Sequence, residues 1–424
     1  MSESSHVSSH LDSYSAMIVS KYFLIPNDFL NLICVCKKYK DTLDKFHYNP
    51  IPISQTTMFF FKGLETQYIY SDSDLILNDI NSYKYINFTY AQYLALSKQR
   101  KNISFGLITY YKSDVMTLGK TIPKEVKALQ PFCFTKCFTL IDFVLPENVK
   151  QLSVGCFAFC DFLKDAKLNE WILRLPDFCF QKCYSLSTLS IPPSVSSIGN
   201  STFEECKALS LLSFHDNIVE IGTSAFLNCC SLCEVHFSKH VVSINNLIFK
   251  GCSKLTKIEN ITQVTSFGES SFEDCWSLQN IVLPEQLEVM GKRCFLGCTA
   301  LSSISVPSGV CVIPTECFMM CRSLKRVVLN NRVFKLSKKC FYKCYELGIV
   351  ECSECVKSIG EFAFFQCRSL KSIPTYRDLT IQKNVFVECS LLDVSNFHFI
   401  KEPLKHTPVK NKRRKTLSES CCIQ

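Results

Sequence analysis

A Phe-x-x-Cys-x-x-Leu motif that returns every 23 residues is the feature that most constrains the fold of this chain. Its Phe recurs without insertion from Phe134 to Phe364, and a last copy at Phe386 comes one residue early. Two apolar positions keep the same period ahead of the Phe in all but the last copy, with Val241 and Ile244 as one such pair. Self-similarity at a short fixed period is typical of a solenoid, in which each repeat forms one coil.

Spacing within the repeat predicts the local structure of each coil. After the Cys, the pattern Leu-x-x-Ile-x-Leu-Pro sets two apolar residues two positions apart, as at Ile281 and Leu283, so both face the same side of a strand. Pro284 closes that strand because it has no N–H for a ladder. The Ala-Phe-x-x-Cys segment predicts a short helical turn with Phe and Cys on one side. A Gly such as Gly268 before this segment would permit a tight corner.

A single coil cannot bury its own apolar face, but stacked coils convert each apolar position into a continuous ladder. The full pattern, Leu-x-x-Ile-x-Leu-Pro-x-x-Val-x-x-Ile-Gly-x-x-Ala-Phe-x-x-Cys, resembles the BspA-like leucine-rich repeat of bacterial surface proteins and protozoan, including amoebic, parasites. The resemblance implies a leucine-rich-repeat solenoid of short strands and short helical turns over residues 112–395. It also implies a scaffold that binds a protein partner and has no catalytic activity. The first coil is degenerate, because Thr117 and Lys120 replace the leading Leu and Ile.

The 27 Cys residues allow a zinc site or a core of thiols. Six coils carry Cys-Phe-x-x-Cys, as at Cys294 and Cys298, and paired thiolates are good zinc ligands. One Cys of the pair stands where other coils have Thr202, Ala225 or Ala363, whereas the other recurs in every coil. Buried free Cys packs as a small hydrophobe. The pattern therefore favours core thiols, and we predict no metal, no cofactor and no catalytic residue.

Two segments precede the array. Residues 1–55 predict an N-terminal helical cap with two helices, the second capped by Asp28, because the open end of a solenoid needs covering. Residues 25–40 are also similar to the core of an F-box, although Ile25-Pro26 replaces the usual Leu-Pro. That similarity implies an alternative function, in which the chain binds the adaptor of a ubiquitin ligase and serves as its substrate receptor. Residues 56–111 predict irregular first coils.

Residues 396–424 predict a basic tail that ends in a C-a-a-X box. Cys421 would be the thioether acceptor, and a final Gln is typical of farnesylation by a prenyltransferase. A basic run precedes it: Lys410, Lys412, Arg413, Arg414 and Lys415. A prenyl chain and a basic run together supply the two signals that stable anchoring at an anionic membrane requires. The alternative is a nuclear localisation run beside an incidental Cys pair. Some protozoan relatives combine these repeats with this ending, which implies the plasma membrane.

Charge and hydropathy restrict the remaining classes of function. Much of the net charge of +9 lies in the tail, so the body is closer to neutral and we expect no nucleic-acid partner. The amino terminus lacks the apolar run of a signal peptide, so synthesis in the cytosol is expected. Side chains between the buried strand positions should face either solvent alone or a protein partner, whose identity the residues do not specify. The charged or titratable candidates are Glu234, His236, Lys257, Glu259, Arg326 and Glu351.

Overall fold

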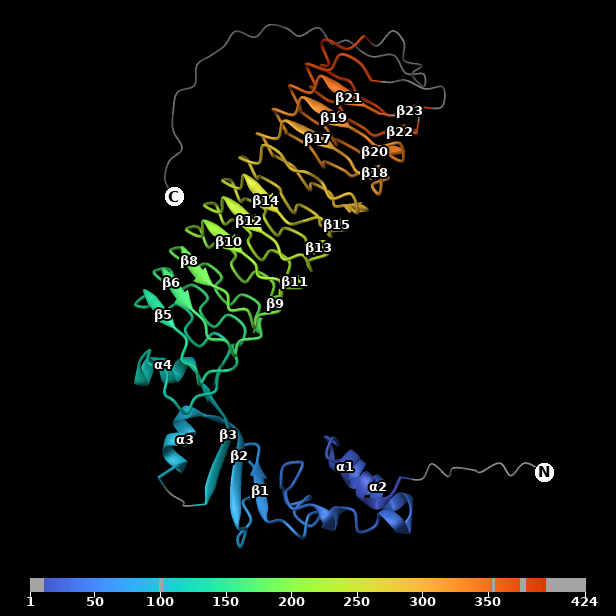
Figure 1. The fold of residues 1–424 in the computed structure, drawn as a ribbon. Helices are drawn as coiled ribbons and strands as arrows, with labels where there is room; N and C mark the ends of the chain where they lie inside the picture. The colour runs from blue at the N-terminus through green and yellow to red at the C-terminus, as the bar shows by residue number, and fades with distance from the viewer. Residues whose placement is uncertain (1–10, 99–101, 353–354, 374–378, 394–424) are drawn as a thin grey trace, which may run out of the picture.

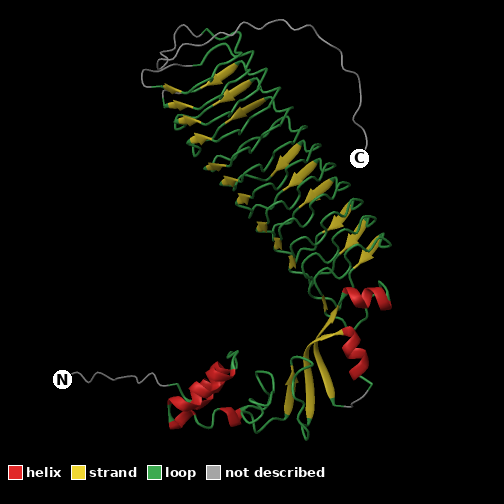
Figure 2. Cartoon of the chain, turned by 180° about the vertical axis from the view of Figure 1, so that it is seen from behind, coloured by secondary structure: helices red, strands yellow, loops and turns green. Residues whose placement is uncertain are grey.

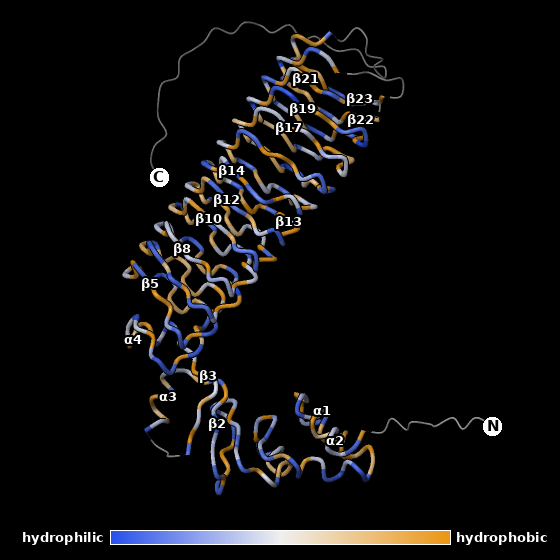
Figure 3. The backbone as a smooth tube through the Cα atoms, viewed as in Figure 1, coloured by the Kyte–Doolittle hydropathy of each residue, from blue (hydrophilic) through white to orange (hydrophobic). Residues whose placement is uncertain are grey.

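The computed structural model describes residues 11–98, 102–352, 355–373 and 379–393. The chain forms an elongated solenoid of about 13 stacked coils, with helices at its N-terminal end (Figure 1). This architecture confirms the predicted leucine-rich-repeat fold. Polar and apolar residues alternate along each coil of the array (Figure 3), as expected where every coil has both an inner and an outer face.

The N-terminal helices pack on residues 43–61, the segment that leads into the first sheet. Helices α1 (Ser13–Ser20) and α2 (Pro26–Val35) precede two 3-10 turns, η1 (Lys37–Tyr39) and η2 (Leu43–Lys45). Met17 and Phe29 from the helices join Phe46, Ile53 and Phe61 in one buried cluster. The chain beyond Phe46 continues this cluster toward the array through a parallel bridge between Tyr48 and Thr66.

The predicted cap of the second helix is wrong. Helix α2 begins at Pro26 with Ile25 as its N-cap residue, and Asp28 lies inside the first turn. Pro is favoured at the first helical position, where its missing N–H has no intrahelical partner to lose, so the helix starts earlier than Asp28. The capping carboxylate belongs to the other helix: Asp12 accepts hydrogen bonds from the backbone N–H groups of Tyr14 and Ser15.

Residues 56–111 are more regular than the sequence predicted. They contribute β1 (Thr66–Ile69), β2 (Ser82–Thr89) and β3 (Ile103–Tyr110), which pair in parallel and continue into β4 (Ala128–Leu129). Helices α3 (Tyr90–Leu96) and α4 (Lys112–Leu118) form the connections after β2 and β3. The register pairs Thr66 with Ser82 and Tyr83 with Ile103, so these coils are shorter than 23 residues. Their period therefore does not match that of the array.

Most regular coils contribute to two rows of short parallel strands, which run along the length of the solenoid (Figure 2). The strands of the first row have three residues: β5 (Asp142–Val144), β6 (Asp165–Lys167), β8 (Thr188–Ser190), β10 (Leu211–Ser213), β12 (Glu234–His236), β14 (Lys257–Glu259), β17 (Ser303–Ser305), β19 (Arg326–Val328) and β21 (Ile349–Glu351). The strands of the second row have two: β7 (Arg174–Leu175), β9 (Ser197–Ile198), β11 (Glu220–Ile221), β13 (Ser243–Ile244), β15 (Ser266–Phe267), β16 (Val289–Met290), β18 (Val312–Ile313), β20 (Lys335–Leu336), β22 (Ser358–Ile359) and β23 (Thr380–Ile381).

The predicted helical turn around each repeat Phe is wrong in detail. In the described coils this segment is a series of tight turns in which the residues two before and two after the Phe adopt left-handed conformations. Around Phe272 these are Ser270, with φ of 54°, and Asp274, with φ of 58°. The N–H groups of all three residues donate to carbonyl oxygens of the next coil at 2.8 Å. In a helix these groups would bond within their own coil, so the turns exchange helical bonds for bonds between coils.

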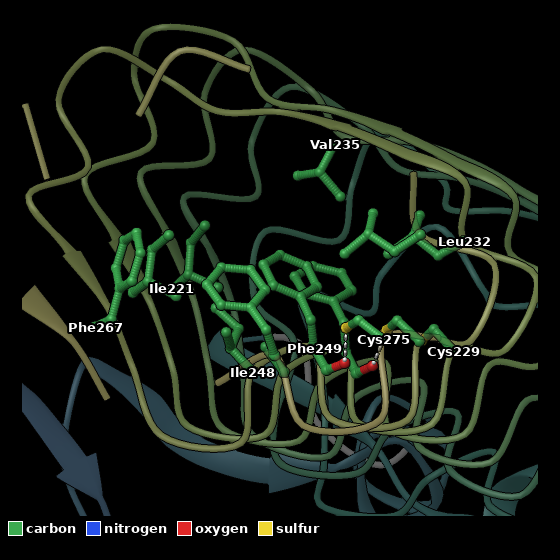
Figure 4. Packing of buried hydrophobic residues seen from close by; sticks show 14 of the residues in the cluster. Ile221, Cys229, Leu232, Val235, Ile248, Phe249, Phe267 and Cys275 are labelled. Atoms are coloured by element: carbon green, nitrogen blue, oxygen red, sulfur yellow. Dashed lines mark hydrogen bonds between the residues drawn. The ribbon is translucent and has the colours of Figure 1, made fainter. Parts of the chain in front are cut away.

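A ladder of Phe rings forms the centre of the core. Successive rings from Phe134 to Phe386 stack with centroids 5.2 to 5.8 Å apart, and most pairs are nearly parallel. The rings of Phe295 and Phe318, for example, lie 5.5 Å apart at an interplanar angle of 1°. Figure 4 shows the ladder between the inward side chains of the two strand rows, with Val235 on one side and Ile221 on the other. Stacking therefore buries one aromatic ring in every coil.

Candidate partner-binding surface

Four of the six predicted contact residues lie together on β12 and β14. The register sets Glu234 beside Lys257 and His236 beside Glu259. His236 Nδ1 lies 2.6 Å from Glu259 Oε2, and its Nε2 lies 3.6 Å from a carboxylate oxygen of Glu234. The Lys257 ammonium contacts the other oxygen of Glu259. These four side chains are called the His236 cluster below.

The charges of the His236 cluster stabilise one another at the surface. The hydrogen bond from the Lys257 ammonium lowers the pKa of the Glu259 carboxyl, and the same bond raises the pKa of Lys257. Exposed ion pairs contribute only about 0 to 1 kcal/mol to folding stability. The cluster therefore adds little to the stability of the solenoid, although it offers a partner a fixed arrangement of charges.

The other two predicted residues form a separate pair farther along the same row. Arg326 on β19 binds the Glu351 carboxylate on β21, with N–O distances of 2.7 and 2.9 Å. The coil that contains Asn280 and Val282 separates this pair from the His236 cluster and has no assigned strand in the row. The structure therefore divides the six residues into two sites.

Sequence reasoning missed the apolar side chains that share this row. Leu211 is exposed on β10, directly beside Glu234 in the parallel register. Val282 is exposed in the coil that follows β14. Both occupy outward positions, where neighbouring coils carry polar residues. The sequence did contain a signal for them, because each is an apolar residue at a strand position that should face outward. The row consequently combines charged and apolar contact groups.

The thiols of the repeat are core groups with a specific hydrogen bond. From Cys160 to Cys389, the Cys three residues after each Phe donates from Sγ to the carbonyl oxygen of the Phe in the preceding coil. Cys275 donates to Phe249 and Cys252 donates to Phe226, both at 3.2 Å (Figure 4). Burial raises the pKa of the other thiol of the pair, as at Cys294, to about 12. Zinc binds the thiolate form, so this environment opposes metal binding. Within the described ranges, no three His, Cys, Asp or Glu side chains converge to hold a metal.

The predicted lipidation site, Cys421, and the basic residues Lys410, Lys412, Arg413, Arg414 and Lys415 lie outside the described residues. In the part of the chain that the structure describes, the helices are too short or too polar to cross a bilayer.

The repeated coil and the two rows of short parallel strands define a leucine-rich-repeat solenoid. The chain belongs to the family described as the BspA type leucine-rich repeat region, whose sequence model matches residues 54–187, 173–302 and 288–402. The match begins well before residue 112, so the short coils around β1 to β3 are part of the same family region. No curated protein sequence matches the chain.

The chain is similar to several solved structures of leucine-rich repeat proteins. A leucine-rich repeat protein from Bacteroides ovatus is 24% identical with a TM-score of 0.54, covering 66% of this chain and 77% of that one. One from Eubacterium ventriosum is 17% identical with a TM-score of 0.47, covering 76% and 91%. A leucine-rich cell surface protein from Faecalibacterium prausnitzii is 21% identical with a TM-score of 0.43, covering 60% and 86%. Leucine-rich repeat proteins are in general non-catalytic binding scaffolds.

Proposed function

We propose that this chain is a non-catalytic scaffold that binds a protein partner through the row of three-residue strands, with the His236 cluster as a main contact. One observation carries the proposal: inward positions of the row stay apolar, whereas outward positions change in charge and size from coil to coil. The fold requires the inward residues, as at Val235 and Val327, which are fully buried. It does not require the charges of Glu234 or Arg326, so binding explains them better than folding does.

Charge reversal tests this assignment. Glu234→Lys combined with Glu259→Lys should reduce partner recovery in quantitative affinity purification by about tenfold or more, the effect of losing roughly 1.4 kcal/mol of binding free energy. Lys335→Glu, on an exposed position of the second row, is the matched control and should leave recovery unchanged. Equal recovery by wild type and the double variant would contradict the proposal.

We also propose that the tail holds the scaffold at an anionic membrane, as a farnesyl thioether on Cys421 acting with the basic run, and that this membrane is the plasma membrane. Support comes from the coincidence of the C-a-a-X ending with Lys412, Arg413, Arg414 and Lys415. A single lipid chain binds a bilayer reversibly, and each basic residue near an anionic surface adds about 1 kcal/mol. The proposal takes Gln424 as the carboxyl-terminal residue.

Membrane fractionation of the full chain tests the anchor. Cys421→Ser should release the protein from the pellet, whereas Cys422→Ser, a matched change one residue away, should leave it there. Neutralising Lys412 to Lys415 should weaken sedimentation, and raised salt should have the same effect on wild type by screening. If Cys421→Ser pellets like wild type, the thioether is not the anchor, and the basic run must be considered as a nuclear signal.

A second candidate function, substrate receptor of a ubiquitin ligase, is favoured by the surface of the N-terminal helices. Tyr22, Leu24 and Val35 are 81%, 86% and 71% exposed, which leaves an apolar face on α1, α2 and the link between them. Large exposed apolar residues on paired helices are typical of protein contacts. Pull-down with the ligase adaptor separates the two functions: Leu24→Glu should abolish adaptor binding if this function holds, and absence of wild-type binding excludes it.

A further inference from the structure

Strand β5 has one strand neighbour and one open edge. It lies at the end of the sheet β5–β6–β8, next to the degenerate coil in which residues 119–121 form no strand. Ile141 accepts a hydrogen bond from Lys164, and Leu145 donates one to Lys167, so alternate residues of this strand bond toward β6. The backbone groups of Asp142 and Val144 point the other way. Among the described residues, neither is bonded to the preceding coil.

An open groove of about 470 Å³ runs beside this edge. It is lined by Lys120, Thr121, Ile122, Thr139, Leu140, Ile141, Asp142, Phe143, Val144 and Pro146. Such a volume falls in the range of sites that hold ligands, about 300 to 1,000 Å³. Its rim is apolar: Ile141 is 51% exposed and Val144 is 67% exposed. Helix α4, which lies near β5 in Figure 1, carries two exposed apolar residues, Met116 and Leu118.

The charges at the groove favour a cationic residue in the occupant. Asp142 and Asp165 lie directly beside each other in the parallel register, and both are exposed. Like charges in register are unfavourable, and within the described part of the chain neither carboxylate is in an ion pair, although Asp165 accepts a hydrogen bond from the Thr188 hydroxyl at 2.8 Å. The nearby Lys120 ammonium donates instead to the carbonyl oxygen of Thr139 at 2.5 Å.

We propose that β5 is a docking edge for an extended segment of a partner protein, which adds a strand there and directs a Lys or Arg toward Asp142. Open N–H and C=O groups would bind its backbone, and the groove would hold its alternating apolar side chains. This inference rests on the proposed scaffold function and specifies how a partner is held. Within the His236 cluster, β12 is paired on both sides, between β10 and β14, so its contacts come from side chains.

Binding of defined peptides to the full chain tests the docking edge. The probe is a pool of heptapeptides in which Val, Ile or Phe alternates with Thr around a central Lys, and a second pool has Glu at the centre. Wild type should prefer the Lys pool by about tenfold, and Asp142→Lys should reverse that preference. Hydrogen exchange should show new protection at residues 142–144, whereas residues 234–236 of β12, which is paired on both sides, should not change.

A proline substitution separates backbone pairing from apolar adhesion. Val144→Pro removes the outward N–H while leaving the bonds to β6, and an edge strand tolerates Pro at such a position. This variant should bind the Lys pool about tenfold more weakly, whereas Val144→Thr, which keeps the N–H, should stay within about twofold of wild type.

The outcomes distinguish the docking edge from the scaffold function. Failure of wild type to retain either pool, or equal binding by Val144→Pro and wild type, overturns the docking edge. If the charge-reversed His236 cluster still loses its cellular partner in that case, the scaffold function stands without β5. If peptides bind at β5 but charge reversal at Glu234 and Glu259 leaves recovery of the cellular partner unchanged, the docking edge stands and the proposed role of the His236 cluster is wrong.

Discussion

At the scale of single residues, the repeat Cys does more than fill space. Its Sγ donates to a Phe carbonyl of the preceding coil, and that carbonyl already accepts an N–H within its own turn, as Phe249 does from Cys252 and Cys275. The sequence predicted burial of these thiols from their period. It could not predict the hydrogen bond, because the bond depends on how two coils are offset, and spacing within one coil carries no information on that offset.

Buried thiols make stability depend on alkaline pH. Burial raises the pKa of Cys294 from 9.0 to about 12, so between these values the folded state keeps a proton that the unfolded state loses. The contribution of this thiol to folding stability is therefore fully present below about pH 8 and falls as pH rises. The free energy of unfolding decreases by at most about 1.4 kcal/mol per pH unit for one thiol. The free energy of unfolding of wild type, measured by urea denaturation, should decrease between about pH 9 and 10.5.

The matched variant for this pH dependence is Cys294→Ala, because Ala225 and Ala363 already occupy the same position in other coils. It should lose stability less steeply with rising pH than wild type does. Identical slopes in the two proteins would show that this thiol does not titrate on unfolding.

The Phe ladder predicts a large loss of stability from a single truncation. Phe272→Ala removes a fully buried ring stacked between Phe249 and Phe295, at centroid distances of 5.8 and 5.3 Å. Emptying such a site costs about 3 to 5 kcal/mol. Lys257→Ala, which removes an exposed ion pair, should change the Tm little. Thermal unfolding compares them, and equal Tm values would refute the role of the ladder.

At the scale of the element, the turn segment shows where local sequence signals fail. Ser270, Arg293 and Lys339 adopt left-handed conformations, with φ between 54° and 56°, although such residues rarely do so. Nothing in these residue types indicates a left-handed turn, so a short helix was the reasonable prediction. Hydrogen bonds to the next coil stabilise the unusual conformation, and these bonds exist only once the coils have stacked.

The Gly that follows the second apolar position has a different role from the predicted one. Gly291 does not have a positive φ, but a Cβ atom there would lie 2.3 Å from the carbonyl carbon of Gly268 in the preceding coil. Close approach between coils therefore excludes a side chain, as it does at Gly222, where a Cβ would lie 2.5 Å from the backbone nitrogen of Asn200.

This contact predicts that Gly291→Ala destabilises the protein. The added methyl forces two backbone segments apart, and overpacking of this kind costs about 1 to 3 kcal/mol. Gly348→Ala is the control, because its Cβ would meet nothing closer than 3.4 Å and should change stability by no more than about 0.5 kcal/mol. Urea unfolding measures both, and equal free energies of unfolding would mean that the coils separate at Gly291 without strain.

At the scale of the whole molecule, the strict period predicted the array but not its full extent. Residues 126–364 keep the 23-residue step, and there the sequence located every ladder. Around β1 to β3 the sequence predicted only irregular coils, because unequal coil lengths leave no period that would locate the strands. The candidate surface was predicted in part: the charged residues follow from strand alternation, but the open edge of β5 depends on a neighbouring coil that fails to form a strand.

Removal of the N-terminal cap should have only a local effect, because each coil contacts only its neighbours. Deletion of residues 1–40 takes Met17 and Phe29 from the cluster and exposes Phe46 and Phe61. Amide exchange in β1 should accelerate about tenfold for each 1.4 kcal/mol lost, whereas β19 and β20 should keep their rates, because each coil contacts only its neighbours. Uniform acceleration along the chain would contradict this one-dimensional cooperativity.

The hydrogen bonds between coils also determine how the molecule responds to force. They run from each coil to the next, along the long axis, so a pull on the two ends loads them in series. The weakest coil peels away first, and its release passes the load to the next. Each coil of 23 residues frees about 75 to 80 Å of extended chain. A protein held at one end and bound to a partner along its length would therefore lengthen in even steps, as an extensible tether, while its remaining coils stay folded.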